Sequence, residues 1–174
     1  MSGHSKWSKV KNRKAVTDAV KNKINTKMAK LISVEIKKAN GDAKAANVLA
    51  VIKKARENNV PNENIERALR KNDNAAQVES IMYEAYGPGG VALMIEALTD
   101  NRNKAASEVK HILSLNGSAL AAPGSASWAF TKTAEGYMPN TMVPISEEDG
   151  AKLDILIEAL EDNDEVQEIW TNAE

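Results

Sequence analysis

No cysteine occurs among the 174 residues of this chain. This absence excludes disulfide bonds, thiolate metal ligands and cysteine nucleophiles, and it is typical of a protein from a reducing compartment. Long apolar runs are also missing: no stretch approaches the roughly 18 apolar residues of a membrane helix. The first residues carry positive charge instead of the apolar core of a secretory signal. We therefore expect a cytoplasmic protein with no membrane partner.

Residues that carry chemistry are scarce as well. The two histidines, His4 and His111, are not at metal-ligand spacing, so we expect no metal site. No serine lies in the G-x-S-x-G context of a nucleophile. The glycine-rich residues 87–90 lack the Gly-Lys-Ser/Thr ending of a phosphate-binding loop, and a tight turn between two strands explains them better. We predict neither an enzyme, a cofactor nor a small-molecule substrate.

Aromatic residues make up only 4% of the chain, while hydrophobic residues make up 43%. The core must therefore be built from Ala, Val, Ile, Leu and Met, a mixture that is typical of proteins in which helices dominate. The length allows one domain or two small ones.

The net charge of −1 hides a segregation of charge. Residues 1–71 contain 14 Lys and 4 Arg against 2 Asp and 4 Glu, a charge of +12. Residues 72–174 contain 5 Lys and Arg against 18 Asp and Glu, a charge of −13. This division predicts two domains that have different partners or that attract each other.

Positive charge is densest in residues 3–30, where nine Lys and Arg stand against the single acid Asp18. Such a segment favours a nucleic acid, because neutralising phosphates releases condensed counterions. Trp7, among the first cations, offers a face on which a base can stack. The alternative is a solvated lysine-rich helix face with Trp7 packed on its own domain. The candidate nucleic-acid-binding residues are Gly3, His4, Ser5, Lys6, Trp7, Lys9, Lys11, Arg13, Lys14, Lys21, Lys23, Lys27 and Lys30.

Apolar spacing in the basic half predicts three helices. The first covers roughly residues 18–39 and ends at Asn40-Gly41. The second starts from Asp42 as its N-cap and continues through Ala55. The third is short and opens near Pro61. We expect a small all-helical basic domain over residues 1–71 and a linker over residues 72–77.

The acidic half, residues 78–174, alternates between strand and helix patterns. Strands are predicted at 81–86, 91–98, 127–130, 138–143 and 166–170. Two amphipathic helices are predicted, one after Asp100 or Asn101 that ends at Asn116-Gly117, and one that Ser146 caps. The predicted fold class is α+β: the helical domain, then a sandwich of a mainly antiparallel sheet and two helices.

Several motifs together resemble the YebC family, whose mitochondrial members are called translational activators of cytochrome oxidase. They are GHSKW at 3–7, KNRK at 11–14, NVPNENIERA at 59–68, YEAYGPGGVA at 83–92 and TDNRN at 99–103. The resemblance extends from the first residues to Phe130 and resumes at IEALED (157–162) and VQ (166–167). It implies a third domain inserted into the second. Here only residues 131–137 stand at that place, so we expect a short connection instead.

The resemblance implies a nucleic-acid-binding regulator of gene expression. Family members are implicated as ribosome-associated translation factors that ease synthesis through difficult, proline-rich stretches, and they have also been described as DNA-binding transcriptional regulators. Lys outnumbers Arg in the basic half, and Lys makes point-charge contacts whereas Arg reads guanine edges, so we favour RNA and the ribosome over DNA. A protein-docking adaptor that uses the acidic domain is a further alternative.

Overall fold

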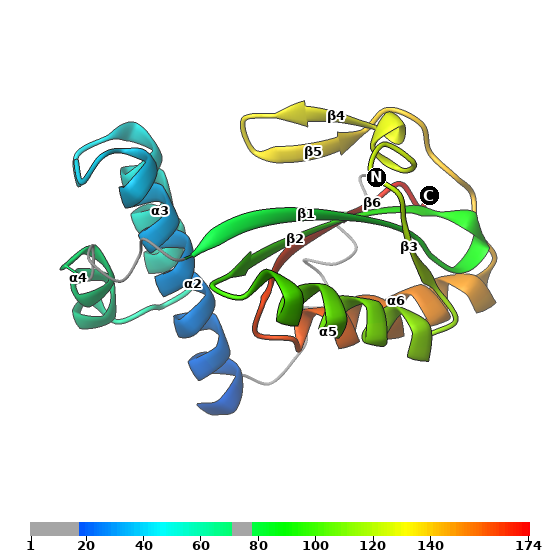
Figure 1. Cartoon of the computed structure of the whole chain (residues 1–174), viewed down its shortest axis with the longest axis horizontal. Helices are drawn as coiled ribbons and strands as arrows, with labels where there is room; N and C mark the ends of the chain where they lie inside the picture. The colour runs from blue at the N-terminus through cyan, green and yellow to red at the C-terminus, as the bar shows by residue number, and fades with distance from the viewer. Residues whose placement is uncertain (1–17, 71–77) are drawn as a thin grey trace. The chain divides into compact units, whose positions relative to one another are not determined.

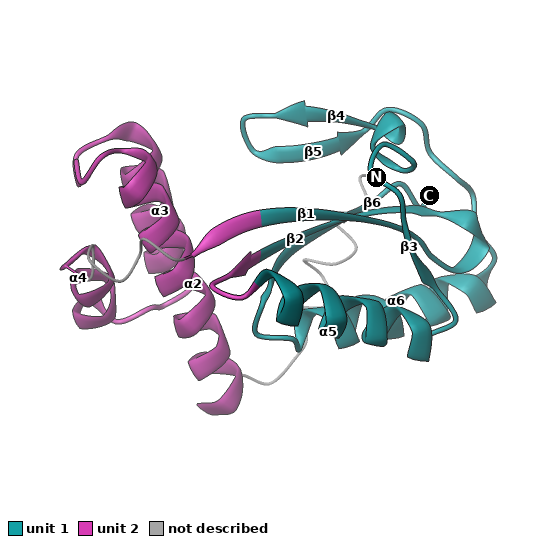
Figure 2. Ribbon diagram, in the orientation of Figure 1, with its two compact units in different colours: residues 1–14, 81–97, 102–174 teal, residues 15–80, 98–101 magenta. Residues whose placement is uncertain are grey.

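The structure is a computed structural model, and it describes residues 18–70 and 78–174. These residues form two compact units, which Figure 2 shows in different colours. One unit holds three helices, the start of the first strand and residues 98–101; the other holds the remainder of the α+β part. No helix among the described residues is long and apolar enough to cross a membrane. The predicted α+β class is confirmed.

Three helices build the helical unit: α2 (Asp18–Lys38), α3 (Ala46–Glu57) and α4 (Asn62–Arg70). Each buries one apolar stripe in a shared core, as the helical spacing predicts. The fully buried members are Met28, Ile32, Ile36, Val48, Ile52, Ala55, Val60, Ile65 and Ala68. Burying these side chains stabilises α3 and α4 in particular, since helices of 12 and 9 residues are marginal in isolation.

The connections between these helices follow the predicted signals with one exception. Asn40 and Gly41 adopt positive φ angles of 52° and 86°, and the Gly41 N–H donates to the carbonyl of Ile36. Asp42 was predicted to cap α3, and this was wrong. Its carboxylate accepts the N–H of Lys44 at 2.9 Å, a local turn, and α3 begins only at Ala46 after Ala45, which makes no side-chain cap.

A four-stranded sheet forms the centre of the second unit. Its strands are β1 (Glu79–Tyr86), β2 (Ala92–Thr99), β3 (Ala119–Ala121) and β6 (Val166–Thr171), in the spatial order β3-β1-β2-β6. Strand β3 pairs antiparallel with β1, and β6 pairs antiparallel with β2. The glycine-rich residues form the turn between β1 and β2, as predicted, with a short 3-10 segment, η2 (Pro88–Gly90). Strand β3 was not predicted, because three residues are too short for an alternation pattern.

Helices α5 (Arg102–Leu115) and α6 (Glu147–Glu161) both cover one face of this sheet (Figure 1). The core between them contains Leu93 and Ile95 from the sheet, Val109 from α5, and Leu153 and Leu156 from α6. The hydroxyl of Ser146 accepts the Asp149 N–H at 3.1 Å and so caps α6, as predicted.

The opposite face of the sheet is covered by a short 3-10 segment, η3 (Ser127–Ala129), and by a hairpin of β4 (Phe130–Thr133) and β5 (Gly136–Pro139). Two predicted strands were wrong here. Residues 127–129 are helical, so the strand starts at Phe130, and residues 140–143 lie outside β5. Phe130, Tyr137 and Trp170 form a chain of edge-on aromatic contacts that packs the hairpin on β6.

Candidate functional site

Nine of the thirteen candidate nucleic-acid-binding residues fall outside the described residues. These are Gly3, His4, Ser5, Lys6, Trp7, Lys9, Lys11, Arg13 and Lys14. Their role therefore stays a prediction from the sequence. The other four, Lys21, Lys23, Lys27 and Lys30, all lie on α2.

Helix α2 divides its four candidate lysines between two sides. Lys23, Lys27 and Lys30 are spaced by four and three residues, so they share one side of the helix, and all three are half-exposed. Lys21 lies two residues before Lys23, about 200° around the axis. Its ammonium pairs with the carboxylate of Asp18 at 3.7 Å. Both of these side chains are exposed, so the pair contributes little to stability.

Lys30 is partly committed to the fold. Its ammonium lies 3.4 Å from the backbone carbonyl oxygen of Leu98 within the same unit, a long hydrogen bond.

The rest of the helical unit adds further positive charge. Residues 18–70 contain 12 Lys and Arg against 6 Asp and Glu, a charge of +6. On α4, Arg67 pairs with Glu63 at 3.0 Å and Arg70 with Glu66 at 2.8 Å, so much of its charge is balanced on the helix itself. The unit is thus positive through α2 and α3 more than through α4.

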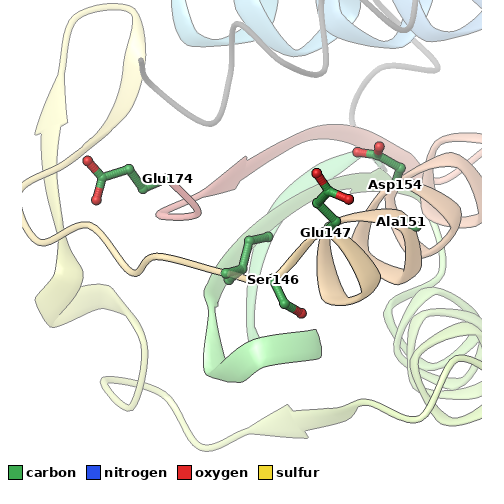
Figure 3. A pocket seen from close by; sticks show the side chains of 7 residues that line it. Ser146, Glu147, Ala151, Asp154 and Glu174 are labelled. Carbon is green, nitrogen blue, oxygen red and sulfur yellow. The ribbon is translucent and has the colours of Figure 1, made fainter.

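A depression of about 340 Å³ lies at the start of α6 in the acidic unit (Figure 3). Three carboxylates line it, Glu147 and Asp154 from α6 and Glu174 from the last described residues, together with Ile145, Ser146, Gly150 and Ala151. Negative side chains repel phosphate groups, so this depression does not suit a nucleic acid. Among the residues that the structure describes, no three His, Asp or Glu side chains gather to hold a metal ion.

The loop between β3 and η3 is held by two side chains from β1. The Glu84 carboxylate accepts the N–H groups of Gly124, Ala126 and Ser127 at 2.8, 2.8 and 2.9 Å. Tyr86, two residues on and hence on the same face of β1, donates its hydroxyl hydrogen to the carbonyl oxygen of Ser125. This loop is therefore fixed by contacts about 40 residues apart in sequence, which local patterns do not reveal.

The same network orients Trp128. Its indole N–H donates to the Tyr86 hydroxyl oxygen at 3.1 Å, while 58% of the residue stays exposed. Trp128 lies inside the strand predicted at residues 127–130, and no role was predicted for it. Its position directly after the loop PGSAS was the one signal that could have separated it from the core.

Glu84 gives a testable pH dependence. Burial raises the pKa of its carboxyl, but the three backbone N–H donors lower it by more, so the pKa lies below its ordinary value of 4.5. The stabilisation from the ionised form is therefore present above about pH 4.5 and is lost as the pH falls through the lowered pKa. We expect Glu84→Gln to reduce the urea midpoint at neutral pH, with a gap from the parent protein that is smaller at an acidic pH below 4.5.

The control for this experiment is Glu135→Gln, which removes the same charge from an exposed position in the β4–β5 turn. A Glu84→Gln variant whose deficit is equal at both pH values would show that the carboxylate charge contributes nothing beyond shape.

The described residues thus define an α+β protein with a basic helical part and an acidic sheet part. Two family models match the sequence of this chain: "TACO1/YebC protein N-terminal domain" over residues 5–75 and "TACO1/YebC second and third domain" over residues 78–135 and 132–173. The chain belongs to the TACO1/YebC family.

Relatives of this chain carry the name "Probable transcriptional regulatory protein", so the family is one of regulatory proteins by name. That of Halothermothrix orenii is 39% identical over 165 residues, covering 92% of this chain and 63% of the relative. That of Pelotomaculum thermopropionicum is 48% identical over 134 residues, covering 75% and 55%. The chain therefore spans less than two thirds of these two relatives.

A third relative, from Thermoanaerobacter pseudethanolicus, is 34% identical over 239 aligned residues that cover 100% of this chain and 97% of the relative. This chain has 174 residues, which is 65 fewer than the 239 aligned positions. The relative therefore has at least 65 residues that have no counterpart in this chain. The crystal structure of a conserved hypothetical protein from Aquifex aeolicus has a TM-score of 0.82 at 28% identity and covers 93% of both chains.

Proposed function

We propose that this chain is a nucleic-acid-binding regulator that acts as a ribosome-associated translation factor, with its basic residues on RNA. The observation that carries the proposal is the segregation of charge, +12 in residues 1–71 against −13 in residues 72–174. A charge of this size attracts a polyanion to one half of the chain and repels it from the other.

Lysines support RNA over sequence-specific DNA. The basic half has 14 Lys and 4 Arg. Lys neutralises phosphates as a point charge, whereas bidentate recognition of guanine in the major groove requires Arg or a closely held Lys. On α2, Lys23 and Lys27 lie one turn apart, which suits successive phosphates more than base edges. Easing synthesis through proline-rich stretches is the task that the family resemblance adds.

A DNA-binding transcriptional regulator is the second candidate, and the names of the relatives favour it. The two candidates share the basic surface and differ in the polyanion that they select. An adaptor that docks a protein on the acidic unit is the third candidate, and it needs no basic surface.

Co-sedimentation with ribosomes separates these candidates. We expect the intact chain to pellet with ribosomes at low salt, to be released progressively as salt rises, and to resist competition by unrelated duplex DNA. The matched variant lacks residues 1–16 and keeps α2. We expect it to remain in the supernatant.

Each alternative has its own outcome. Displacement by duplex DNA, together with a footprint on a preferred sequence, would replace the translation factor by the transcriptional regulator. Pelleting that is independent of both residues 1–16 and salt would favour the adaptor.

A further inference from the structure

Two exposed apolar side chains lie on the sheet face opposite α5 and α6. Trp128 on η3 is 58% exposed, and Met138 on β5 is 59% exposed. Met138 faces Thr131 across the hairpin, and residue 129 accepts the N–H of Asn140, so η3 and the end of β5 are joined. We name Trp128, Thr131 and Met138 the Trp128 surface.

Trp128 is held in place before any partner binds. Its indole N–H is bonded to Tyr86, which in turn is bonded to the carbonyl of Ser125. A fixed aromatic ring loses little conformational entropy when it is covered, and tryptophan is the residue type most enriched among the strong contributors to protein interfaces. The ring face remains for apolar contact, because its one polar group is already bonded.

Charge is sparse in the segment of chain that carries this surface and dense elsewhere in the unit. Residues 78–174 contain 17 Asp and Glu against 5 Lys and Arg. Within residues 112–146, however, the only charged residues are Lys132 and Glu135. Two copies of this unit repel each other wherever their acidic residues come close together. A contact through the Trp128 surface brings Trp128, Thr131 and Met138 together, and none of these side chains is charged. A nucleic acid is repelled by the unit as a whole, and a basic peptide prefers the acidic residues of α6.

The comparison with relatives shows what is missing here. The match to the second and third domain is in two segments that meet at residues 132–135, the end of β4 and the two-residue turn before β5. The Thermoanaerobacter relative has at least 65 residues without counterpart in this chain. A segment inserted at this turn emerges beside Met138, and this chain has only Ala134 and Glu135 between the two strands.

We propose that the Trp128 surface is a contact between two copies of this chain. A two-fold axis places Trp128 of one copy against the Trp128 surface of the other, so that the same uncharged residues meet on both sides. This contact is independent of the proposed nucleic-acid binding, which uses the other half of the chain.

Sedimentation velocity across a range of protein concentrations tests this contact. We expect a shift from monomer to dimer as concentration rises, and a stronger dimer at higher salt, because salt screens the repulsion between the two acidic units. Trp128→Gln combined with Met138→Gln is expected to raise the dimer Kd at least about tenfold.

The matched control is Leu115→Gln on α5, where an apolar side chain is 71% exposed outside the Trp128 surface. We expect it to dimerise like the parent chain. Should the double variant lose its circular dichroism spectrum, Met138→Lys alone tests the same contact, because it places two like charges face to face on an exposed strand position.

Three results would overturn the proposal. A parent chain that stays monomeric at every concentration has no such contact. A double variant that dimerises like the parent chain does so elsewhere. A dimer that dissociates as salt rises is held by opposite charges, the basic residues of one copy on the acidic residues of the other.

Discussion

Removing the five positive charges of residues 6–14 is expected to weaken binding to structured RNA about 100-fold near physiological salt. The substitutions are Lys6→Ala, Lys9→Ala, Lys11→Ala, Arg13→Ala and Lys14→Ala. Each phosphate contact that is lost reduces the slope of log K against log salt by about 0.7 to 0.9, so five contacts reduce it by about 4. Titrations by fluorescence anisotropy at several salt concentrations measure both quantities.

The control removes positive charge from the acidic half. Lys110→Ala with Lys132→Ala changes two exposed lysines outside the proposed nucleic-acid-binding residues. We expect neither the affinity for RNA nor its salt slope to change. If the variant with all five substitutions kept its affinity for RNA and its salt slope, residues 6–14 would not be the residues that contact RNA. The acidic unit should stay folded in both variants, since these changes leave its core intact.

Four further candidate lysines lie on helix α2, which the structure describes. Lys23 and Lys27 share one side of the helix, whereas Lys21 lies on the other, and the role of all four lysines stays a prediction. Lys30, through its hydrogen bond to Leu98, shows that a lysine-rich run can also serve the fold. Periodicity was sufficient to place these residues on a helix, but not to find their partners.

The fold followed from the sequence wherever an element has a clear apolar pattern. Helices α2, α5 and α6 have the spacing that burial of one face demands, and strand β2, which is buried on both faces, is a continuous apolar run, so these patterns predicted them. The errors share a cause. Asp42 bonds Lys44 instead of capping α3, and residues 127–129 are turned into a helical segment by Glu84 and Tyr86. At both places, hydrogen bonds from side chains to the backbone determine the local structure. The pattern of apolar residues does not predict such bonds.

The uncharged surface around Trp128 was missed for a related reason. A tryptophan next to buried Ala129 and Phe130 reads as a core residue in sequence, since an apolar run does not say which member faces water. The bond from its indole N–H to the hydroxyl of Tyr86, a residue 42 positions earlier, helps to orient the ring. The orientation of Trp128 is therefore influenced by a long-range contact that a local pattern does not contain.

The core of the acidic unit provides the largest expected effect on stability. Leu156 on α6 is fully buried and belongs to the same cluster as Leu93 and Ile95 of the sheet. Leu156→Ala removes buried apolar atoms and leaves a cavity that the rigid sheet fills poorly. We expect the free energy of unfolding to fall by about 3 kcal/mol, within the range for buried leucines.

Leu115→Ala is the matched control, because it makes the same chemical change on the neighbouring helix α5 at a position that is 71% exposed. We expect a change below about 0.5 kcal/mol there. Urea unfolding followed by the fluorescence of the buried Trp170 reports on this unit, since Trp170 lies on β6 against the sheet core. Equal losses in the two variants would mean that helix propensity, and not the packing of α6 on β2, governs stability. A large loss confined to Leu156→Ala instead places the stability of the unit in the core between the sheet and its two helices.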